Sequence, residues 1–189
     1  MLLKQKDKNV QFVGKLIKMD VKDILVQKKF KVNKFFLNSI FVLILFTIDR
    51  FSKVYVIELA EKTEISEIYI TSFLNSYLVW NTGIAFGLFS LSNEFTYSLF
   101  TALIVLINLI IIYLIIITKD FRKYFFLLIL GGSLGNLFDR LYYKSVPDFI
   151  DFHIGNFHWF IFNIADIFIT LGVICLILGE LLYKKETNE

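Results

Sequence analysis

Long apolar runs alternate with charged segments along this chain. The runs are about 20 residues long, which is the length an α-helix needs to cross roughly 30 Å of hydrocarbon. The pattern therefore predicts four transmembrane helices, and their ends are defined to within about two to four residues. Their approximate bounds are 35–57, 95–117, 124–143 and 159–183.

The segment between the first two predicted helices has a different pattern. Residues 65–80 are rich in Ile, Tyr, Phe, Val and Trp, which favour β-strands. The stretch 81–89, N-T-G-I-A-F-G-L-F, follows, and its Asn and Gly residues indicate a turn with closely packed backbone. We therefore expect an all-α membrane protein with a small extracytoplasmic β-rich cradle and loop between helices one and two.

Charged residues fall unevenly between the predicted loops. The N-terminal segment 1–34 is rich in lysine, and the turn between the second and third helices is also basic. Acidic residues dominate the segment 58–94. Because basic residues of membrane proteins favour the cytoplasmic side, we expect both termini in the cytoplasm and the segments 58–94 and 144–158 outside.

The predicted organisation is a cytoplasmic leader (1–34), a four-helix membrane domain (35–183) and a cytoplasmic tail (184–189). The leader is expected to be a solvated basic tail, and the alternative is a weakly amphipathic helix on an anionic leaflet. It lacks the small-residue cleavage site of a secretory signal. Met19 is a second candidate for the start of the chain.

The composition agrees with a membrane protein. Hydrophobic residues make up 57% of the chain, and the mean hydropathy is +0.67. The single cysteine, Cys175, excludes an intramolecular disulfide. The net charge is only +3, and no nucleic-acid partner is expected.

Amides and carboxylates interrupt the third and fourth apolar runs. Asn136 and Asp139 are three residues apart, and Asn163 and Asp166 repeat this spacing. Residues at this spacing share one face of a helix, so two adjacent antiparallel helices would bring both pairs together. A carboxylate within hydrocarbon is costly unless it has a partner or a function.

The expected partner of Asp166 is Asp148, in a polar loop before the fourth predicted helix. Two carboxyl groups that share a low-dielectric site cannot both ionise cheaply, so one keeps its proton. The ionised group can activate water, and the protonated group can donate to a carbonyl oxygen. The pair predicts an aspartic protease dyad that needs no metal or other cofactor.

Three other readings remain open at this point. A proton-coupled transporter would also use buried Asp, although four helices are few and no discontinuous helix pair is evident. A membrane scaffold would need no buried carboxylates. A metal site is the chemical rival, but the spacing of the nearby acidic residues and histidines matches no strong motif. Those residues are Asp148, Asp151, His153 and His158.

Two further charged pairs each allow two interpretations. Asp49 and Lys53, at i and i+4, form either an ion pair that reaches the membrane interface or a pair whose Asp49 faces the active-site cavity. Arg140 next to Asp139 is either an interfacial ion pair or a support for the loop that carries Asp148.

Five segments, in this order and at these intervals, resemble the bacterial lipoprotein signal peptidase family, signal peptidase II. Together they form a specific signature, although each alone does not. They are D-R-F-S-K (49–53), N-T-G-I-A-F-G (81–87), G-G-S-L-G-N-L-F-D-R-L (131–141), V-P-D-F-I-D-F (146–152) and F-N-I-A-D (162–166). Arg50 departs from the family pattern, in which glutamine is common, and the leader lies outside the resemblance.

The resemblance implies an aspartic endopeptidase of the bacterial inner membrane, active toward the extracytoplasmic face. Such enzymes remove the signal peptide of diacylglyceryl-modified prolipoproteins, cutting before the lipidated cysteine. The family's catalytic pair falls on Asp148 and Asp166. Its supporting residues fall on Asp49, Asn81, Gly83, Asn136, Asp139, Arg140 and Asn163. Globomycin-type peptides are expected inhibitors, the lipid bilayer is a partner, and the protein is expected to be a monomer.

Overall fold

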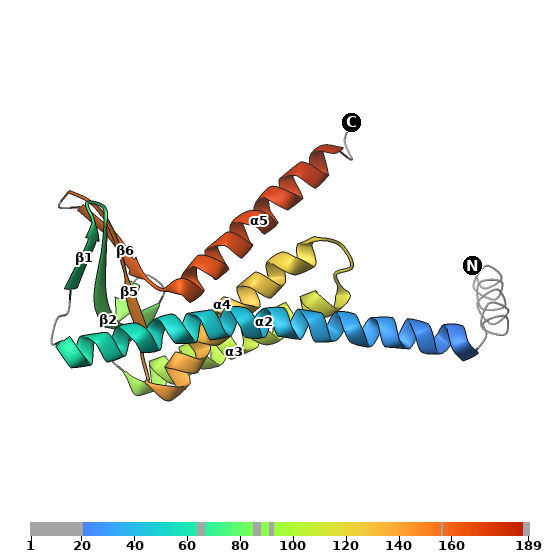
Figure 1. The fold of residues 1–189 in the computed structure, drawn as a ribbon, viewed down its shortest axis with the longest axis horizontal. Coiled ribbons are helices and arrows are strands. Elements are labelled where there is room, and N and C mark those ends of the chain that lie inside the picture. The colour runs from blue at the N-terminus through green and yellow to red at the C-terminus, as the bar shows by residue number, and fades with distance from the viewer. Residues whose placement is uncertain (1–20, 64–66, 85–87, 91–92, 156, 187–189) are drawn as a thin grey trace. The chain divides into compact units, whose positions relative to one another are not determined.

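The computed structural model describes residues 21–63, 67–84, 88–90, 93–155 and 157–186. Residues 1–20 of the predicted leader and 187–189 of the predicted tail lie outside this range. The described residues contain four α-helices, whose bounds follow in chain order (Figure 1). They are α2 (Val21–Thr63), α3 (Glu94–Ile117), α4 (Arg122–Tyr142) and α5 (Ile164–Glu186).

The chain divides into two compact units, Met1–Ile40 and Phe41–Glu189, and α2 runs from the first into the second. The described part of the first unit is the N-terminal portion of α2, so residues 21–34 of the predicted leader are helical and the expectation of a solvated tail is wrong for them. The first helix also extends beyond both predicted bounds, 35 and 57. Every site residue predicted from the sequence belongs to the second unit.

Two small antiparallel sheets accompany the helices of the second unit. The larger has the strand order β1-β2-β5-β6, and the smaller pairs β3 with β4. The strands β1 and β2, between α2 and α3, confirm the predicted β-rich segment 65–80, whereas β3 and β4 come from the stretch around 81–89 that was expected to be a turn. β5 and β6, which follow α4, were not predicted. Their residues were expected to form a polar loop and the start of the fourth helix. The bounds are β1 (Glu67–Thr71), β2 (Leu74–Asn81), β3 (Gly83–Ile84), β4 (Leu88–Ser90), β5 (Val146–Ile154) and β6 (Phe157–Phe162).

The predicted start of the fourth helix at Trp159 is wrong. Trp159 lies in β6, which pairs with β5, and α5 begins only at Ile164. The run F-H-W-F-I-F of β6 is apolar and continuous with the helix that follows, so its periodicity cannot separate a strand from a helix. Asp166 therefore lies in the first turn of α5 rather than deep within a helix.

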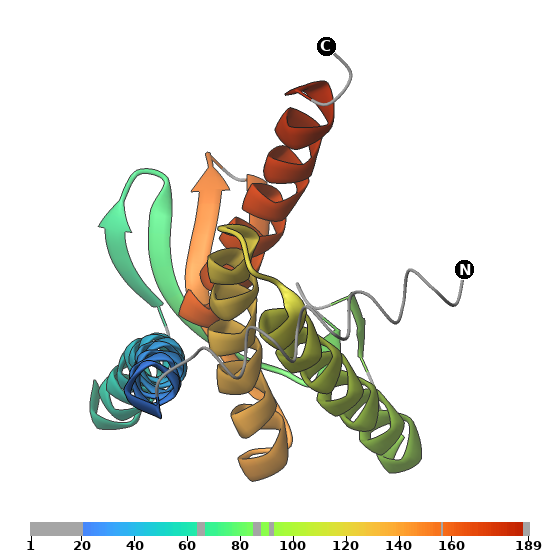
Figure 2. The same cartoon turned by 90° about the vertical axis from the view of Figure 1, so that its right-hand side faces the viewer.

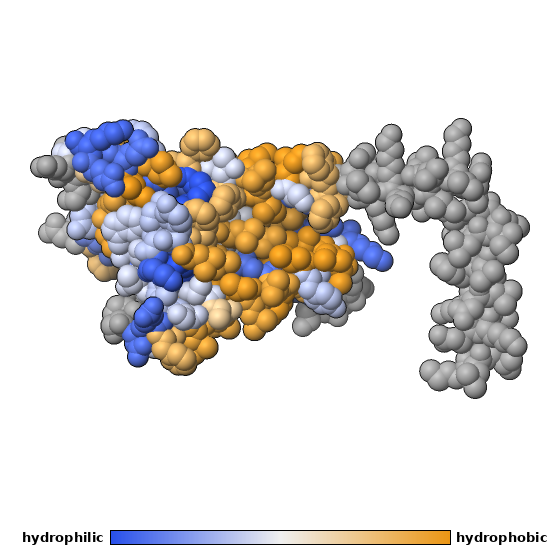
Figure 3. All heavy atoms as spheres, turned by 90° about the horizontal axis from the view of Figure 1, so that it is seen from below, coloured by the Kyte–Doolittle hydropathy of each residue, from blue (hydrophilic) through white to orange (hydrophobic). Residues whose placement is uncertain are grey.

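Two helices among the described residues are long and apolar enough to cross a membrane. They are α3 and the portion Ile164–Leu182 of α5. Hydrophobic side chains dominate the face seen in Figure 3 over the helices, and hydrophilic side chains gather toward the sheets. Large exposed apolar residues occur on all four helices, for example Leu43, Leu106, Leu141 and Ile177. A surface of this kind suits hydrocarbon better than water.

Helix α4 packs against both α3 and α5 (Figure 2). Its glycines also allow a close approach to α2, as the small-xxx-small spacing predicts. A Cβ at Gly131 would overlap the side chain of Leu45, and a Cβ at Gly135 would overlap the carboxylate of Asp49. The contact between α2 and α4 thus requires glycine at both positions.

A buried ionic network joins α2 to α4. Lys53 is fully buried, and its Nζ donates to Asp49 Oδ2 at 2.9 Å, Asn136 Oδ1 at 2.8 Å and Asp139 Oδ2 at 2.7 Å. An ammonium group has three donors, so these bonds satisfy it completely. Arg50 adds an ion pair with Asp139 Oδ1 at 2.6 Å. The interpretation in which Lys53 reaches the membrane interface is therefore wrong.

The packing of α4 on α5 gives a first prediction. A Cβ at Gly132 would overlap the carbonyl oxygen of Ala165, and backbone cannot move aside easily. Gly132→Ala should therefore destabilise the protein by about 1–3 kcal/mol. Gly179→Ala is the control, because its Cβ would lie 3.4 Å from the nearest atom, in the ring of Phe121. Equal apparent melting temperatures of both variants in detergent would contradict this account.

The ionic network gives a second prediction. Lys53→Met leaves Asp49 and Asp139 buried without their shared cation, and breaking such a buried pair costs about 3–5 kcal/mol. Lys62→Met removes an exposed i,i+4 pair with Glu58 and should change stability by less than about 1 kcal/mol. Thermal unfolding of both variants, compared with the unmodified protein, measures the difference. Equal apparent melting temperatures of the Lys53→Met and Lys62→Met proteins would refute a structural role for the network.

Candidate active site

Asp148 lies on β5, in the interior of the larger sheet. Its backbone is opposite Val79 on β2, and its side chain is buried. Asn81 Nδ2 donates to Asp148 Oδ2 at 2.9 Å, and Asn163 Nδ2 donates to Asp148 Oδ1 at 2.5 Å. The expectation of a loop at this position is wrong, and strand pairing fixes this carboxylate more firmly than a loop would.

The surroundings of Asp148 favour its protonated form. Burial raises the pKa of its carboxyl, and the negative charge of Asp166 raises this pKa further, to about 6. The hydrogen bonds from Asn81 and Asn163 act in the opposite direction but are outweighed. A carboxyl group with this pKa can hold or release a proton close to neutral pH, as acid–base catalysis requires.

Asp166 is held by the start of α5. Asn163 directly precedes the helix, and its Oδ1 accepts from Asp166 N at 3.1 Å, whereas Asp166 Oδ2 accepts from Asn163 N at 3.2 Å. This reciprocal pair is a capping box, in which each side chain satisfies a backbone donor of the other residue. Asn163 therefore caps α5 instead of sharing a helical face with Asp166.

Both predicted catalytic acids, Asp148 and Asp166, accept hydrogen bonds from the same residue, Asn163. Asn163 is fully buried, and it donates from its side chain to Asp148 and from its backbone to Asp166. Asn136 Nδ2 adds a bond to Asp166 Oδ1 at 2.8 Å. Asn81 thus donates to Asp148, Asn136 to Asp166 and Asn163 to both. Asn136 and Asn163 converge on Asp166 as predicted, whereas the part played by Asn81 was not predicted from the spacing.

Asp49 and Asp139 support the site from outside this group. Asp49 Oδ1 accepts from Ala165 N at 3.0 Å, so a carboxylate of α2 holds the N-terminal turn of α5. A negative charge is favourable there because of the helix dipole. Asp139 lies in the network with Lys53 and Arg50. The side chain of Asp49 is occupied by Lys53 and Ala165, and it is not among the residues lining the pocket described below.

Lys53 is a residue whose connection to the site was not predicted from the sequence. It connects to Asp166 through one residue, since Lys53 donates to Asn136 and Asn136 donates to Asp166. A lysine four residues from Asp49 in an apolar helix was visible in the sequence, but the second carboxylate of the network, Asp139, comes from another helix. The spacing of Asp49 and Lys53 allowed an ion pair at the membrane interface, because it gives no information about Asp139, which binds Lys53 from another helix.

Arg140 supports the opposite side of the site. Its Nη2 donates to the carbonyl of Gly83 at 3.3 Å, and its Nη1 donates to the carbonyl of Asn136 at 3.2 Å. Gly83 in turn donates its N–H to Asn81 Oδ1 at 2.8 Å, which fixes the amide that contacts Asp148. Of the two interpretations of Arg140, the interfacial ion pair with Asp139 is wrong for the described residues, because Asp139 pairs with the two cations of α2. The other interpretation, a support for the segment that carries Asp148, stays a prediction.

A pocket of about 370 Å³ opens beside Asp148. Asn81 and Gly83 line one part of it, and the aromatic residues Trp80 and Trp159 line another. A polar floor with one titratable carboxyl and apolar aromatic walls suits a substrate that has both a peptide bond and apolar groups. The predicted cradle therefore contributes to the wall of this pocket.

A second cluster lies further along the same hairpin. Asp151, His153 and His158 place their ligand atoms within 4.8 Å of one another, whereas Asp148 does not belong to this group. The cluster is separate from the hydrogen bonds that hold Asp148 and Asp166.

Curated relatives resemble the chain over most of its length. The lipoprotein signal peptidase of Pelagibacter ubique (strain HTCC1062) is 51% identical over 162 residues, which are 85% of this chain and 98% of that protein. The lipoprotein signal peptidase of Francisella tularensis subsp. novicida (strain U112) is 48% identical over 124 residues, covering 62% of this chain and 76% of that protein.

A solved structure and a family profile agree with these relatives. A bacterial membrane enzyme determined by the in meso method at 2.3 Å resolution superposes with a TM-score of 0.66 and 31% identity, covering 81% of this chain and 92% of that one. The profile of the family described as Signal peptidase (SPase) II matches residues 41–182. The chain therefore belongs to the signal peptidase II family and is a membrane-embedded peptidase.

Proposed function

We propose that the chain is an intramembrane aspartic endopeptidase that removes signal peptides from prolipoproteins. The observation that carries the proposal is the pair of carboxyl groups, Asp148 and Asp166, joined through the buried Asn163 beside a pocket. The names of the relatives, lipoprotein signal peptidases, support the substrate class. No metal takes part in the proposed reaction.

In the proposed reaction, water attacks the carbonyl carbon of the scissile peptide bond. The ionised member of the pair accepts a proton from this water, and the protonated member donates a proton to the carbonyl oxygen. In the breakdown of the tetrahedral species, the carboxyl group that took up the water proton donates it to the leaving nitrogen, and the C–N bond breaks. The other carboxylate takes back the proton of the former carbonyl oxygen as the carbonyl re-forms, which restores the starting pair. The two groups titrate as a pair, so the initial proton belongs to the pair rather than to either residue.

The supporting residues act on the geometry of this pair. Asn81 and Asn163 orient Asp148, and Asn136 with the capping box orients Asp166. Gly83 and Arg140 hold Asn81, while Asp49 and Asp139 connect α2 to the start of α5 and to α4. Groups held in this way lose little freedom when the substrate binds.

The proposed substrate is a prolipoprotein whose cysteine carries diacylglycerol, with cleavage directly before that cysteine. Its acyl chains remain in the bilayer, and its peptide enters the pocket beside Asp148. The aromatic walls Trp80 and Trp159 support this placement, since such rings favour the level of the headgroups. Globomycin-type peptides should inhibit by occupying the same pocket, and the working unit is a monomer.

The proposed topology is a four-span protein of the bacterial inner membrane. The apolar helices α3 and α5 support two of the spans, and the glycine-mediated packing of α4 supports a third beside them. The basic leader (1–34) and tail (184–189) then lie in the cytoplasm, and the sheets with the active site lie outside. The membrane domain corresponds to residues 35–183.

The proposed dyad gives a third prediction. Asp148→Asn and Asp166→Asn should each lower the rate of cleavage of a diacylglyceryl-modified precursor by at least about 100-fold, because either change removes one proton-transfer group. Asp120→Asn is the matched control, since Asp120 is exposed and pairs with Arg122 away from the dyad. Cleavage by purified protein measures the rates, and thermal unfolding checks the fold. Cleavage at an unchanged rate by either dyad variant would contradict the proposed mechanism.

The raised pKa of Asp148 gives a fourth prediction. Between pH 4 and pH 6 the folded protein holds a proton on Asp148 more often than the unfolded chain does, so stability falls as the pH rises through this window. The change due to Asp148 is at most about 3 kcal/mol. Asp148→Asn should lack this part of the pH dependence. The difference between the apparent melting temperatures of the two proteins, followed from pH 4 to pH 8, measures it, and a constant difference contradicts the raised pKa.

A further inference from the structure

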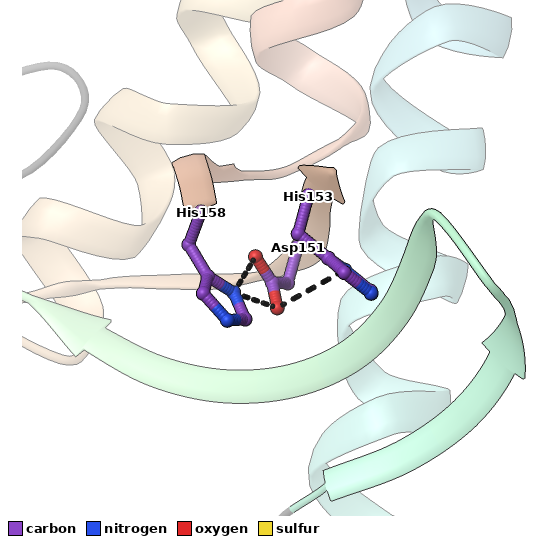
Figure 4. A group of neighbouring side chains, drawn as sticks. All are labelled: Asp151, His153 and His158. Atoms are coloured by element: carbon purple, nitrogen blue, oxygen red, sulfur yellow. Dashed lines mark hydrogen bonds and ion pairs between the residues drawn. The ribbon is translucent and has the colours of Figure 1, made fainter. Parts of the chain in front are cut away.

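The register of one β-hairpin brings three possible metal ligands together. Asp151 and His153 are two residues apart on β5 and so share one face of the strand. His158 is the partner of His153 on β6, and a register shift between Phe152 and His153 breaks the regular pairing there. Such irregularities commonly redirect side chains. Figure 4 shows the carboxylate of Asp151 between the two imidazole rings.

The distances within the cluster fit one small cation. His158 Nδ1 lies 2.8 Å from Asp151 Oδ2, and His153 Nδ1 lies 3.8 Å from the same oxygen. Two ligand atoms on one tetrahedral zinc ion are about 3.4 Å apart, given bonds of about 2.0–2.2 Å. The two distances fall on either side of this value, so small rotations of the side chains would suffice to form the site.

His153 supplies the observation that points to a ligand. Its residue is only 7% exposed, and its Nδ1 has no hydrogen-bond partner among the described residues. At 3.8 Å the carboxylate of Asp151 is too far away for a hydrogen bond. A buried ring nitrogen without a partner is unfavourable, and an ion held together with Asp151 would satisfy it.

The kinds of donor select the ion. Two imidazole nitrogens and one carboxylate are ligands typical of Zn²⁺, whereas Ca²⁺ and Mg²⁺ prefer oxygen ligands alone. Three protein ligands leave a fourth position for water. His158 is half exposed, with 53% of its side chain accessible, which gives an ion a route to the buried partners.

We propose that Asp151, His153 and His158 bind one Zn²⁺ ion that ties β5 to β6. Asp148 lies near the start of β5, and Asn163, which contacts both acidic groups, directly follows β6. An ion that joins the two strands would therefore stiffen the hairpin that connects Asp148 to Asn163 and Asp166. His158 also lines the pocket beside Asp148, which places the ion at the rim of that pocket. The ion has a structural role and takes no part in the activation of water.

Zinc binding to the full-length purified protein tests the proposal. The chain contains two histidines, His153 and His158, and one cysteine, Cys175, so few other strong zinc ligands compete. The affinity tag must contain no histidine. After treatment with a chelator and its removal, the unmodified protein should bind one Zn²⁺ per chain and melt at a higher temperature with Zn²⁺ than without it.

One variant and one control separate the outcomes. His158→Gln should weaken Zn²⁺ binding by at least about tenfold and abolish the thermal shift, while the exposure of this side chain makes unfolding an unexpected result. Asp120→Asn, a change of an exposed carboxylate, should leave both unchanged. Visible absorption of Co²⁺ bound in place of Zn²⁺ should show the strong bands of a tetrahedral site in the unmodified protein and in Asp120→Asn, but not in His158→Gln.

The outcomes that would overturn the proposal are equally direct. Equal Zn²⁺ binding by the unmodified protein and by the double variant H153Q/H158Q would place the ion elsewhere. If the unmodified protein does not bind Zn²⁺, the proposal is wrong and the cluster is only the contact of His158 with Asp151. Asp148→Asn should bind Zn²⁺ normally, so the zinc result is independent of the result for the proposed dyad.

Discussion

Burying carboxylates among apolar helices is the physical constraint on which this structure depends. Asp49 and Asp139 are balanced by the cations of α2, Lys53 and Arg50. Asp148 and Asp166, in contrast, receive their hydrogen bonds from amide groups. A cation close to a carboxylate fixes its negative charge, whereas an amide leaves the exchange of a proton possible. The first pair can therefore act as a support, and the second can act as an acid and a base.

The presence of four helices in the described part of the chain could be predicted from the sequence, but the bounds of the first and the start of the fourth could not. The repeated Asn-x-x-Asp spacing pointed to Asn136, Asn163 and Asp166 as neighbours, although Asn163 meets Asp166 through a helix cap and not on a shared helical face. Lys53 could not be placed in the same way, because two of its three acceptors lie more than 80 positions away. Whether a lysine in an apolar helix is buried depends on such distant partners.

The hairpin of β5 and β6 shows a second limit of the sequence pattern. F-H-W-F-I-F is as apolar as the helix after it, and only the pairing with β5 makes it a strand. That pairing also gathers Asp151, His153 and His158, whose spacing along the chain resembles no metal motif. Local patterns give the identity of the polar groups, but cross-strand register decides which of them meet.

The capping box has a consequence for variation of this protein. Asn163 caps the start of the last helix, and it also holds Asp148 and Asp166 by hydrogen bonds from its side chain and its backbone. A one-residue insertion after Asn163 would turn Asp166 by about 100° around the helix and remove it from Asn136 and Asn163 at once. At this end of α5, therefore, the start of the apolar helix and the position of one acidic group cannot change independently of each other.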